Sequence, residues 1–76
     1  MNILYVSYLC PDCPPAEEKL NQEGIAYEKK DISKSLKNLK AFLALRDSRE
    51  EFNEIKEKGQ IGVPLLVRED NELLFF

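Results

Sequence analysis

Residues 2–15 read NILYVSYLCPDCPP, and the remaining elements are arranged around them. Residues 3–6 are apolar, β-favouring and uninterrupted, which predicts a central strand buried on both of its faces. A loop follows, and then two cysteines interleaved with prolines. Because the first turn of a helix leaves its amide hydrogens unpaired, it tolerates proline, so a helix is predicted to begin between Pro11 and Pro15. Gly24 is placed to close this helix as a C-terminal cap.

Three further strands are predicted downstream. An edge strand with one buried face is predicted where apolar residues alternate with charged ones, at Ile25, Tyr27 and Ile32. Residues 62–67 form a third strand that is opened by Pro64. The dipeptide Asp70-Asn71 is typical of a tight turn, and residues 73–76 are then a short final strand.

A second helical region lies between the second and third predicted strands. From Ser35 onward, apolar residues recur at helical spacing, at Leu36, Leu39, Phe42 and Leu43. Asp47-Ser48 offers a new helix N-cap before a further apolar run that ends at Gly59. The region is therefore predicted to be one broken helix or two short ones.

The order of the predicted elements is strand, helix, strand, helix, strand, strand. A strand-helix-strand beginning requires a parallel pair, and the tight turn makes the last two strands an antiparallel hairpin. We therefore expect an α/β fold with a mixed four-stranded sheet and flanking helices. A chain of 76 residues has room for one thin core, so residues 1–76 are expected to be a single domain.

Composition narrows the classes of function. Apolar residues at 43% and charged residues at 33% are typical of an ordinary globular domain, not of a disordered chain. The net charge of −3 argues against binding of nucleic acid. Because the first residues show neither a signal peptide nor a membrane helix, we expect a cytoplasmic protein with no membrane partner. The absence of histidine excludes hydrolases that rely on a histidine base.

Cys10 and Cys13 are the only concentrated chemistry in the chain, and three interpretations compete. A disulfide that closes so small a loop contributes only about 1.9 kcal/mol of stability, against about 3 kcal/mol for a fifteen-residue loop, so a structural staple is a poor explanation. A metal ion or iron-sulfur cluster needs further ligands beyond two thiolates, from a carboxylate, from glutathione or across a dimer. A redox couple needs no other residue.

The spacing of the two cysteines suits redox chemistry. Cys10 at the start of the helix directs its sulfur at unpaired amide hydrogens and at the positive end of the helix dipole, which stabilises a thiolate. Cys13, one turn further along, is expected to be more buried and to act as the resolving thiol. The carboxylate of Asp12 between them opposes thiolate formation at Cys10.

Val63-Pro64 is the second informative dipeptide. A proline at the start of a buried strand removes a donor from the sheet, and it is retained there for a reason such as a cis bond. An ordinary strand-opening proline is the alternative.

The chain resembles the glutaredoxin family of the thioredoxin-fold superfamily. The resemblance rests on the pattern Tyr5-x-x-Tyr8-x-Cys10-Pro11-x-Cys13 and on the later Gly62-Val63-Pro64. The small bacterial glutaredoxin-related proteins look closest, through the wording LKAFLALRD at 39–47 and IGVP at 61–64. The likeness spans nearly the whole chain.

The resemblance implies a thioredoxin-like fold and a thiol-disulfide oxidoreductase without a tightly bound cofactor. Cys10 is then the nucleophile and Cys13 the resolving thiol, and Pro64 is cis. The backbone of Val63 pairs with the substrate in that family. The implied substrate-binding residues are Tyr8, Pro11, Val63 and Pro64. Protein or small-molecule disulfides are the implied substrates, and either glutathione or a thioredoxin-reductase-type flavoenzyme is the reductant.

The chain departs from the family at its glutathione contacts. Ser7 stands where glutaredoxins usually carry a lysine or arginine, and the Gly-Gly-Asp-type stretch and the closing C-terminal helix are not found. Substitute contacts to glutathione are available from Arg46, Arg49, Lys58 or Gln60. Because the missing helix leaves residues 73–76 as apolar surface near a bare sheet edge, we also expect a homodimer.

Overall fold

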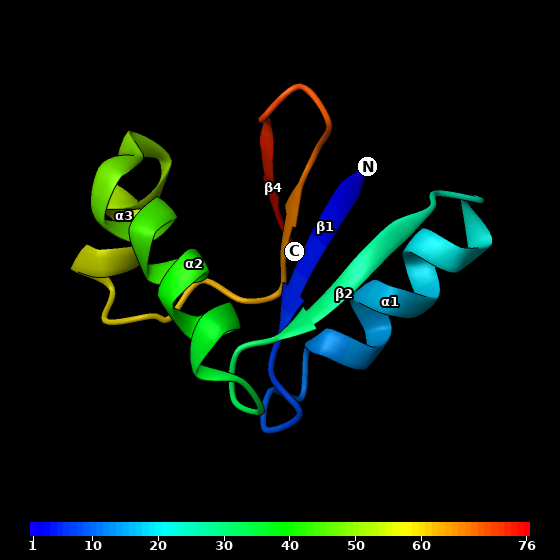
Figure 1. Cartoon of the computed structure of the whole chain (residues 1–76), viewed down its shortest axis with the longest axis horizontal. Helices are drawn as coiled ribbons and strands as arrows, with labels where there is room; N and C mark the ends of the chain where they lie inside the picture. The colour runs from blue at the N-terminus through cyan, green and yellow to red at the C-terminus, as the bar shows by residue number, and fades with distance from the viewer.

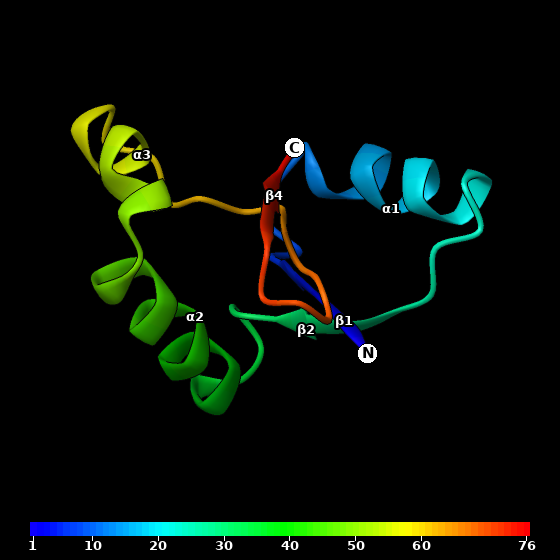
Figure 2. The ribbon, with the colours of Figure 1, turned by 90° about the horizontal axis from the view of Figure 1, so that it is seen from above.

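The computed structural model describes residues 1–76 as an α/β fold with a four-stranded mixed sheet. Figures 1 and 2 show α1 on one side of this sheet and α2 with α3 on the other. The elements, in chain order, are β1 (Asn2–Val6), α1 (Cys13–Gln22), β2 (Tyr27–Asp31), α2 (Leu36–Ser48), the single 3₁₀ turn η1 (Glu50–Phe52), α3 (Asn53–Glu57), β3 (Leu65–Val67) and β4 (Leu73–Phe75). None of the helices combines the length and the apolar character needed to cross a membrane.

The sheet has the strand order β2-β1-β3-β4. β1 runs parallel to β2, with Asn2 opposite Tyr27, and antiparallel to β3, with Leu4 opposite Leu66. β3 and β4 form an antiparallel hairpin in which Leu66 lies opposite Leu74. The predicted element order, the parallel pair, the hairpin and the central position of β1 are all confirmed.

Both faces of β1 are buried, because its side chains alternate between two apolar clusters. On the side of α1 the buried residues are Leu4, Val6, Cys13, Leu20 and Leu66. On the side of α2 they are Tyr5, Ile32, Phe42, Phe52, Leu65 and Leu73. The second cluster is organised by edge-to-face aromatic contacts, with ring centroids of Phe42 and Phe52 at 5.8 Å and of Phe52 and Phe75 at 5.1 Å.

Local capping accounts for the end of α1 and the start of α2, but not for the break in the second helical region. α1 begins at Cys13, inside the predicted window, and Gly24 follows its end at φ +72°. Ser35 caps α2 by accepting the amide hydrogen of Asn38. The predicted N-cap at Asp47-Ser48 is wrong, because Ser48 lies in the last turn of α2 and its hydroxyl donates to the carbonyl of Ala44. The helical region is instead interrupted at Arg49, whose backbone is extended.

The second strand lies at the edge, as predicted, but it does not have one buried face. Tyr27 packs on the α1 side, whereas Ile32, five positions later and just beyond β2, packs on the α2 side. An odd separation places two side chains of an extended chain on opposite faces. Lys29 on the α1 side pairs with Glu17 at 3.1 Å, so charged side chains cover this edge.

Two other predictions need correction. The third strand begins at Leu65, and residues 62–64 form the loop that leads into it. Leu36, which the helical spacing placed with the core-facing residues, is 74% exposed at the first position of α2. β4 is the strand at the edge of the sheet opposite to β2. Phe75, its last residue, and Phe76 are both partly exposed. Homodimer formation through this edge stays a prediction, which light scattering of the purified chain tests.

Candidate functional site

The loop between β1 and α1 is fixed to the end of β2 by hydrogen bonds. The carboxylate of Asp31 accepts the amide hydrogens of Tyr8 at 3.0 Å and of Ser33 at 2.8 Å. The Ser7 hydroxyl accepts the amide hydrogen of Leu9 at 3.2 Å and also bonds to the Ser33 hydroxyl. Ser7 is therefore a buried structural residue of this loop, and its side chain is committed to neighbouring groups.

The two cysteines lie on either side of the point where α1 begins: Cys10 is in the preceding loop, and Cys13 is the first residue of the helix. The amide hydrogen of Cys10 bonds to the carbonyl of Ser7 at 2.9 Å, and that of Cys13 bonds to the carbonyl of Cys10 at 3.3 Å. Cys13 is only 2% exposed and belongs to the apolar cluster under α1. Cys10 is half-buried, and both are free thiols. One sulfur is thus accessible and the other is covered.

Val63 and Pro64 lie against the accessible sulfur. The Cys10 thiol donates a long hydrogen bond, 3.9 Å, to the carbonyl oxygen of Val63. The Val63-Pro64 peptide bond is cis, as predicted, and Pro64 is buried. Two segments more than fifty residues apart in the chain therefore meet at Cys10.

The loop that carries Val63 is held in place by hydrogen bonds from α2 and by close packing against the buried Phe52. The Arg46 guanidinium donates from Nε to the carbonyl of Ile61 at 3.0 Å and from Nη2 to that of Gln60 at 2.8 Å. Gly62 adopts φ +109°, and a Cβ there would lie 2.8 Å from Cε1 of the buried Phe52. From the sequence, Arg46 and Gln60 were predicted only as contacts to glutathione. A hydrogen bond from a side chain to a backbone carbonyl leaves no recognisable pattern in the sequence.

Burial raises the pKa of the Cys13 thiol from its ordinary value of 9.0 to about 12. A backbone hydrogen bond from Ser7 acts in the opposite direction. A hydrogen bond and a charge from Cys10, together with the carboxylate of Glu17, add to the rise. Cys13 is consequently a neutral thiol at physiological pH.

The start of α1 offers fewer amide donors to Cys10 than the sequence suggested. Pro11, Pro14 and Pro15 carry no amide hydrogen, and that of Cys13 is already bonded. Asp12 is the N-cap residue of α1, and its side chain does not cap the helix. The Asp12 amide is the remaining backbone donor of this segment, so the expected set of unpaired amides is reduced to one.

An open groove of about 780 Å³ begins at Cys10 and runs between α2, α3 and the end of β4. Val63 and Pro64 line it, whereas Tyr8 and Pro11 do not. Tyr8 is 64% exposed, and the Lys34 ammonium lies 5.5 Å from its ring centroid. Of the six predicted site residues, the structure brings Cys10, Cys13, Val63 and Pro64 together and leaves Tyr8 and Pro11 on the outer surface.

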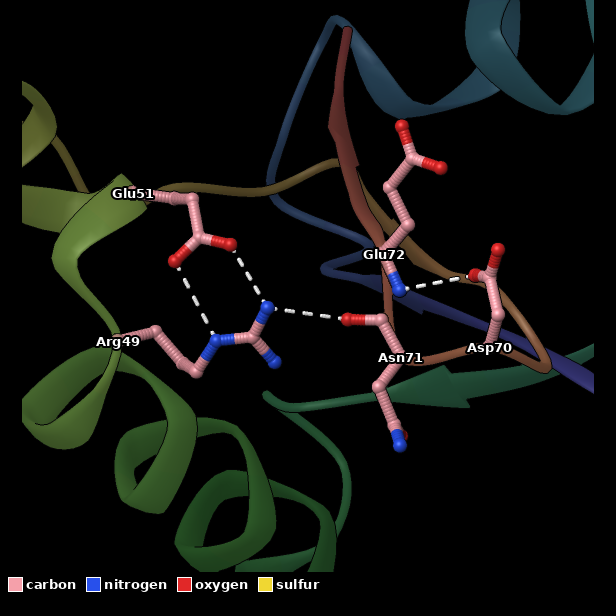
Figure 3. Close-up of polar contacts among 5 residues, drawn as sticks. All are labelled: Arg49, Glu51, Asp70, Asn71 and Glu72. Carbon is pink, nitrogen blue, oxygen red and sulfur yellow. Dashed lines mark hydrogen bonds and ion pairs between the residues drawn. The ribbon is translucent and has the colours of Figure 1, made fainter.

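The four substitute glutathione contacts separate into two pairs. Arg46 and Gln60 line the groove, and Arg49 and Lys58 do not. Figure 3 shows where Arg49 lies: its Nη2 donates to Glu51 at 2.7 Å and to the carbonyl of Asn71 at 3.0 Å. Arg49 therefore ties η1 to the turn between β3 and β4.

The cysteine pair is not part of a larger set of metal ligands. Nowhere in the chain do three or more histidine, cysteine, aspartate or glutamate side chains gather closely enough to hold a metal ion. Cys10 and Cys13 are two of the four ligands that a tetrahedral site takes. A metal or cluster at this pair would need its remaining ligands from outside the chain.

Comparison with known proteins gives one relative. No protein-family model and no solved structure matches the chain. An uncharacterized protein of Haemophilus influenzae is 38% identical over 72 residues, which are 95% of this chain and 84% of the relative.

Proposed function

This chain belongs to the same family as the uncharacterized protein of Haemophilus influenzae, and from its site we propose that it is a glutaredoxin-like thiol-disulfide oxidoreductase with a thioredoxin-like fold. The element order from β1 to β4 and the dithiol at the start of α1 support the proposed fold. The proposed compartment is the cytoplasm, because a dithiol reductant acts where thiols are kept reduced.

One observation carries the proposal: the half-buried Cys10 lies at the head of an open groove, whereas Cys13, three residues later, is only 2% exposed. Disulfide exchange needs an attacking sulfur that a substrate can reach and a second thiol that is protected until the first has reacted. Exposure separates the two cysteines in this way, and the raised pKa of Cys13 keeps it protonated meanwhile.

In the first proposed step, the Cys10 thiolate attacks one sulfur of a substrate disulfide. The substrate S–S bond breaks, a mixed disulfide forms between Cys10 and the substrate, and the other substrate sulfur leaves as a thiolate that takes up a proton. Formation of the mixed disulfide removes the Cys10 thiol that had helped to raise the pKa of Cys13. This part of the rise is therefore lost once Cys10 has reacted, whereas burial, the largest cause of the raised pKa, remains.

In the second proposed step, Cys13 gives its proton to the departing sulfur and attacks the Cys10 sulfur. The mixed disulfide breaks, the Cys10–Cys13 disulfide forms, and the second substrate thiol is released. Two electrons pass from the protein dithiol to the substrate disulfide, and the two protein thiol protons end on the two substrate thiols. Two molecules of glutathione, which leave as glutathione disulfide, or the dithiol of a flavoenzyme then reduce the Cys10–Cys13 disulfide by the reverse exchange.

Trapping of the mixed disulfide tests the proposal. The reduced Cys13→Ser variant, mixed with a peptide disulfide, is expected to accumulate a covalent adduct at Cys10 that dithiothreitol removes. The wild type is expected to pass through the adduct to an internal disulfide, and Cys10→Ser to form no adduct. An adduct at Cys13 in the Cys10→Ser variant, formed as fast as that at Cys10, would contradict the assigned roles. Colour and bound iron after anaerobic purification, with no exchange, would favour the metal or iron-sulfur module instead.

A further inference from the structure

The groove that starts at Cys10 has mostly apolar walls. Its apolar side chains come from the loop before Cys10, from α2, from α3 and the segment after it, and from the end of the chain, among them Leu9, Leu39, Ile55, Ile61 and Phe76. Several of them are exposed, including Leu9 at 70% and Ile61 at 58%. A ligand that covered these two side chains would remove apolar surface from water, which favours binding.

Only two charged side chains line the groove, Asp12 and Arg46. Arg46 is half-buried and directs Nε and Nη2 at the carbonyls of Ile61 and Gln60. Asp12, two residues after Cys10, is exposed and makes neither an ion pair nor a helix-capping bond. The charge that faces a ligand beside the reactive sulfur is therefore negative.

We propose that this groove binds an extended protein segment whose disulfide cysteine is flanked by apolar residues and by a lysine or arginine, with Asp12 as the specificity-determining residue. The inference rests on the proposed function, and it names the substrate class of the same site. A basic residue beside the attacked disulfide is attracted by the Asp12 carboxylate. Glutathione disulfide, which carries four carboxylates and two ammonium groups, is repelled by it and presents little apolar surface to the walls.

The charge arm of the test uses two peptides, each joined to a second copy of itself by one disulfide. The peptides are identical except for a lysine or a glutamate next to the cysteine, and both have leucine on the other side. A unit charge about 7 Å away in water changes a rate about threefold, so the lysine peptide should be reduced about sevenfold faster than the glutamate peptide at low salt. The ratio should approach one in 1 M salt, where the Debye length is about 3 Å.

Two variants assign the preference to Asp12. Asp12→Asn should reduce the ratio of the two rates to about two or less. Glu23→Gln is the matched control, because it removes one negative charge at the opposite end of α1 and should leave the ratio unchanged. The ratio is the informative quantity, since any change in the intrinsic reactivity of Cys10 affects both peptides equally.

The apolar arm compares the lysine peptide with a version in which serine replaces leucine. The leucine peptide should react about three- to tenfold faster, and Ile61→Ser should remove most of that advantage. Leu36→Ser is the control, because Leu36 is also an exposed apolar side chain, 74% against 58% for Ile61, but lies outside the groove.

The outcomes separate this inference from the proposed function. If no peptide forms a disulfide with Cys10, the proposed function itself fails. If both peptides react at Cys10 with a ratio near one, or with a ratio that Asp12→Asn leaves unchanged, the exchange chemistry stands and the substrate class is wrong. A second-order rate constant that falls as the protein concentration rises would show a second copy of this chain in the groove, which would also overturn the inference.

Discussion

At the scale of single residues, two cysteines three positions apart lie in opposite environments. Cys10 is half-buried beside a groove, whereas Cys13 is 2% exposed and packs among Leu4, Leu20 and Leu66. The contrast follows from the place where α1 begins, because Cys10 lies in the loop before the helix, whereas Cys13 is its first residue. Cys10 therefore lines the groove, and Cys13 packs between α1 and the sheet.

Alkylation of the native protein should distinguish the two thiols. A thiol with a pKa of about 12 is ionised to only about one part in 10⁵ at pH 7. Iodoacetamide should therefore modify Cys10 alone in the reduced, folded chain, and should modify Cys13 only after unfolding. Peptide mass mapping over time measures both sites. Equal rates at the two cysteines in native buffer would contradict the described environments.

The raised pKa of Cys13 also makes stability depend on pH. Between the ordinary value of 9.0 and about 12 the unfolded thiol is ionised while the folded thiol is not, so unfolding releases a proton. The stabilisation is complete below pH 9 and is lost as the pH rises toward 12. Urea unfolding of the reduced protein at pH 8 and pH 10.5 should show a larger loss of stability for the wild type than for Cys13→Ala. A loss of the same size in both proteins would show that burial of the Cys13 thiol does not cause it.

In the loop beside Cys10, Gly62 is the position where a substitution is expected to lower the stability of the fold most. Gly62→Ala combines a left-handed backbone, φ +109°, with a Cβ only 2.8 Å from the ring of the buried Phe52, so it should cost about 2–4 kcal/mol of stability. Gly24→Ala is the matched control, because φ is +72° there but nothing lies within 4 Å of the new Cβ, and it should cost about 1 kcal/mol. Denaturant unfolding measures both changes, and equal losses would contradict the described contact.

At the scale of elements, α2 positions the segment that faces the cysteines. Arg46 in its last turns bonds two carbonyls of the loop before β3, whereas Arg49 just after it bonds η1 and the β3–β4 turn. The two arginines make similar hydrogen bonds, but only Arg46 lies in the groove. Replacing each arginine in turn therefore separates an effect on stability from an effect on the reaction at Cys10.

Loss of the Arg46 contacts should loosen the loop in front of Cys10. Arg46→Met should lower stability by about 1 kcal/mol, should accelerate amide hydrogen exchange in residues 59–64, and should slow reduction of a peptide disulfide several-fold. Arg49→Met should cost similar stability without slowing the peptide reaction. If the two variants slowed that reaction equally, the loss would reflect stability alone, and the positioning role of Arg46 would be disproved.

At the scale of the whole molecule, the structural features that depend only on neighbouring residues in the sequence were predicted correctly. The apolar run of β1 and the Gly24 cap identified their elements because each depends on neighbouring residues. The failures have a common physical reason. Burial of β2 and of Leu36 depends on which elements pack against them, and the helix break moved from Asp47-Ser48 to Arg49, where tertiary contacts hold an extended backbone.

The candidate site divides in the same way. The spacing of Cys10 and Cys13 and the Val63-Pro64 dipeptide carried their own signal, and the structure brings them together. The walls of the groove carried no such signal in the sequence. Ile55, Ile61 and Phe76 are distant from Cys10 in the chain and line the same groove only after folding. Tyr8 and Pro11, singled out by proximity in sequence, lie outside the groove since the loop turns them toward solvent.

The most direct test of the central claim is an equilibrium redox titration of the purified chain. The protein is incubated in dithiothreitol redox buffers, quenched with acid, alkylated and weighed by intact mass. The account predicts one reversible two-electron transition in which both alkylation sites are lost together, and its absence in Cys10→Ser and Cys13→Ser. Two cysteines that remain alkylated across the whole range, in a protein that is folded, would contradict the claim that Cys10 and Cys13 are a redox couple.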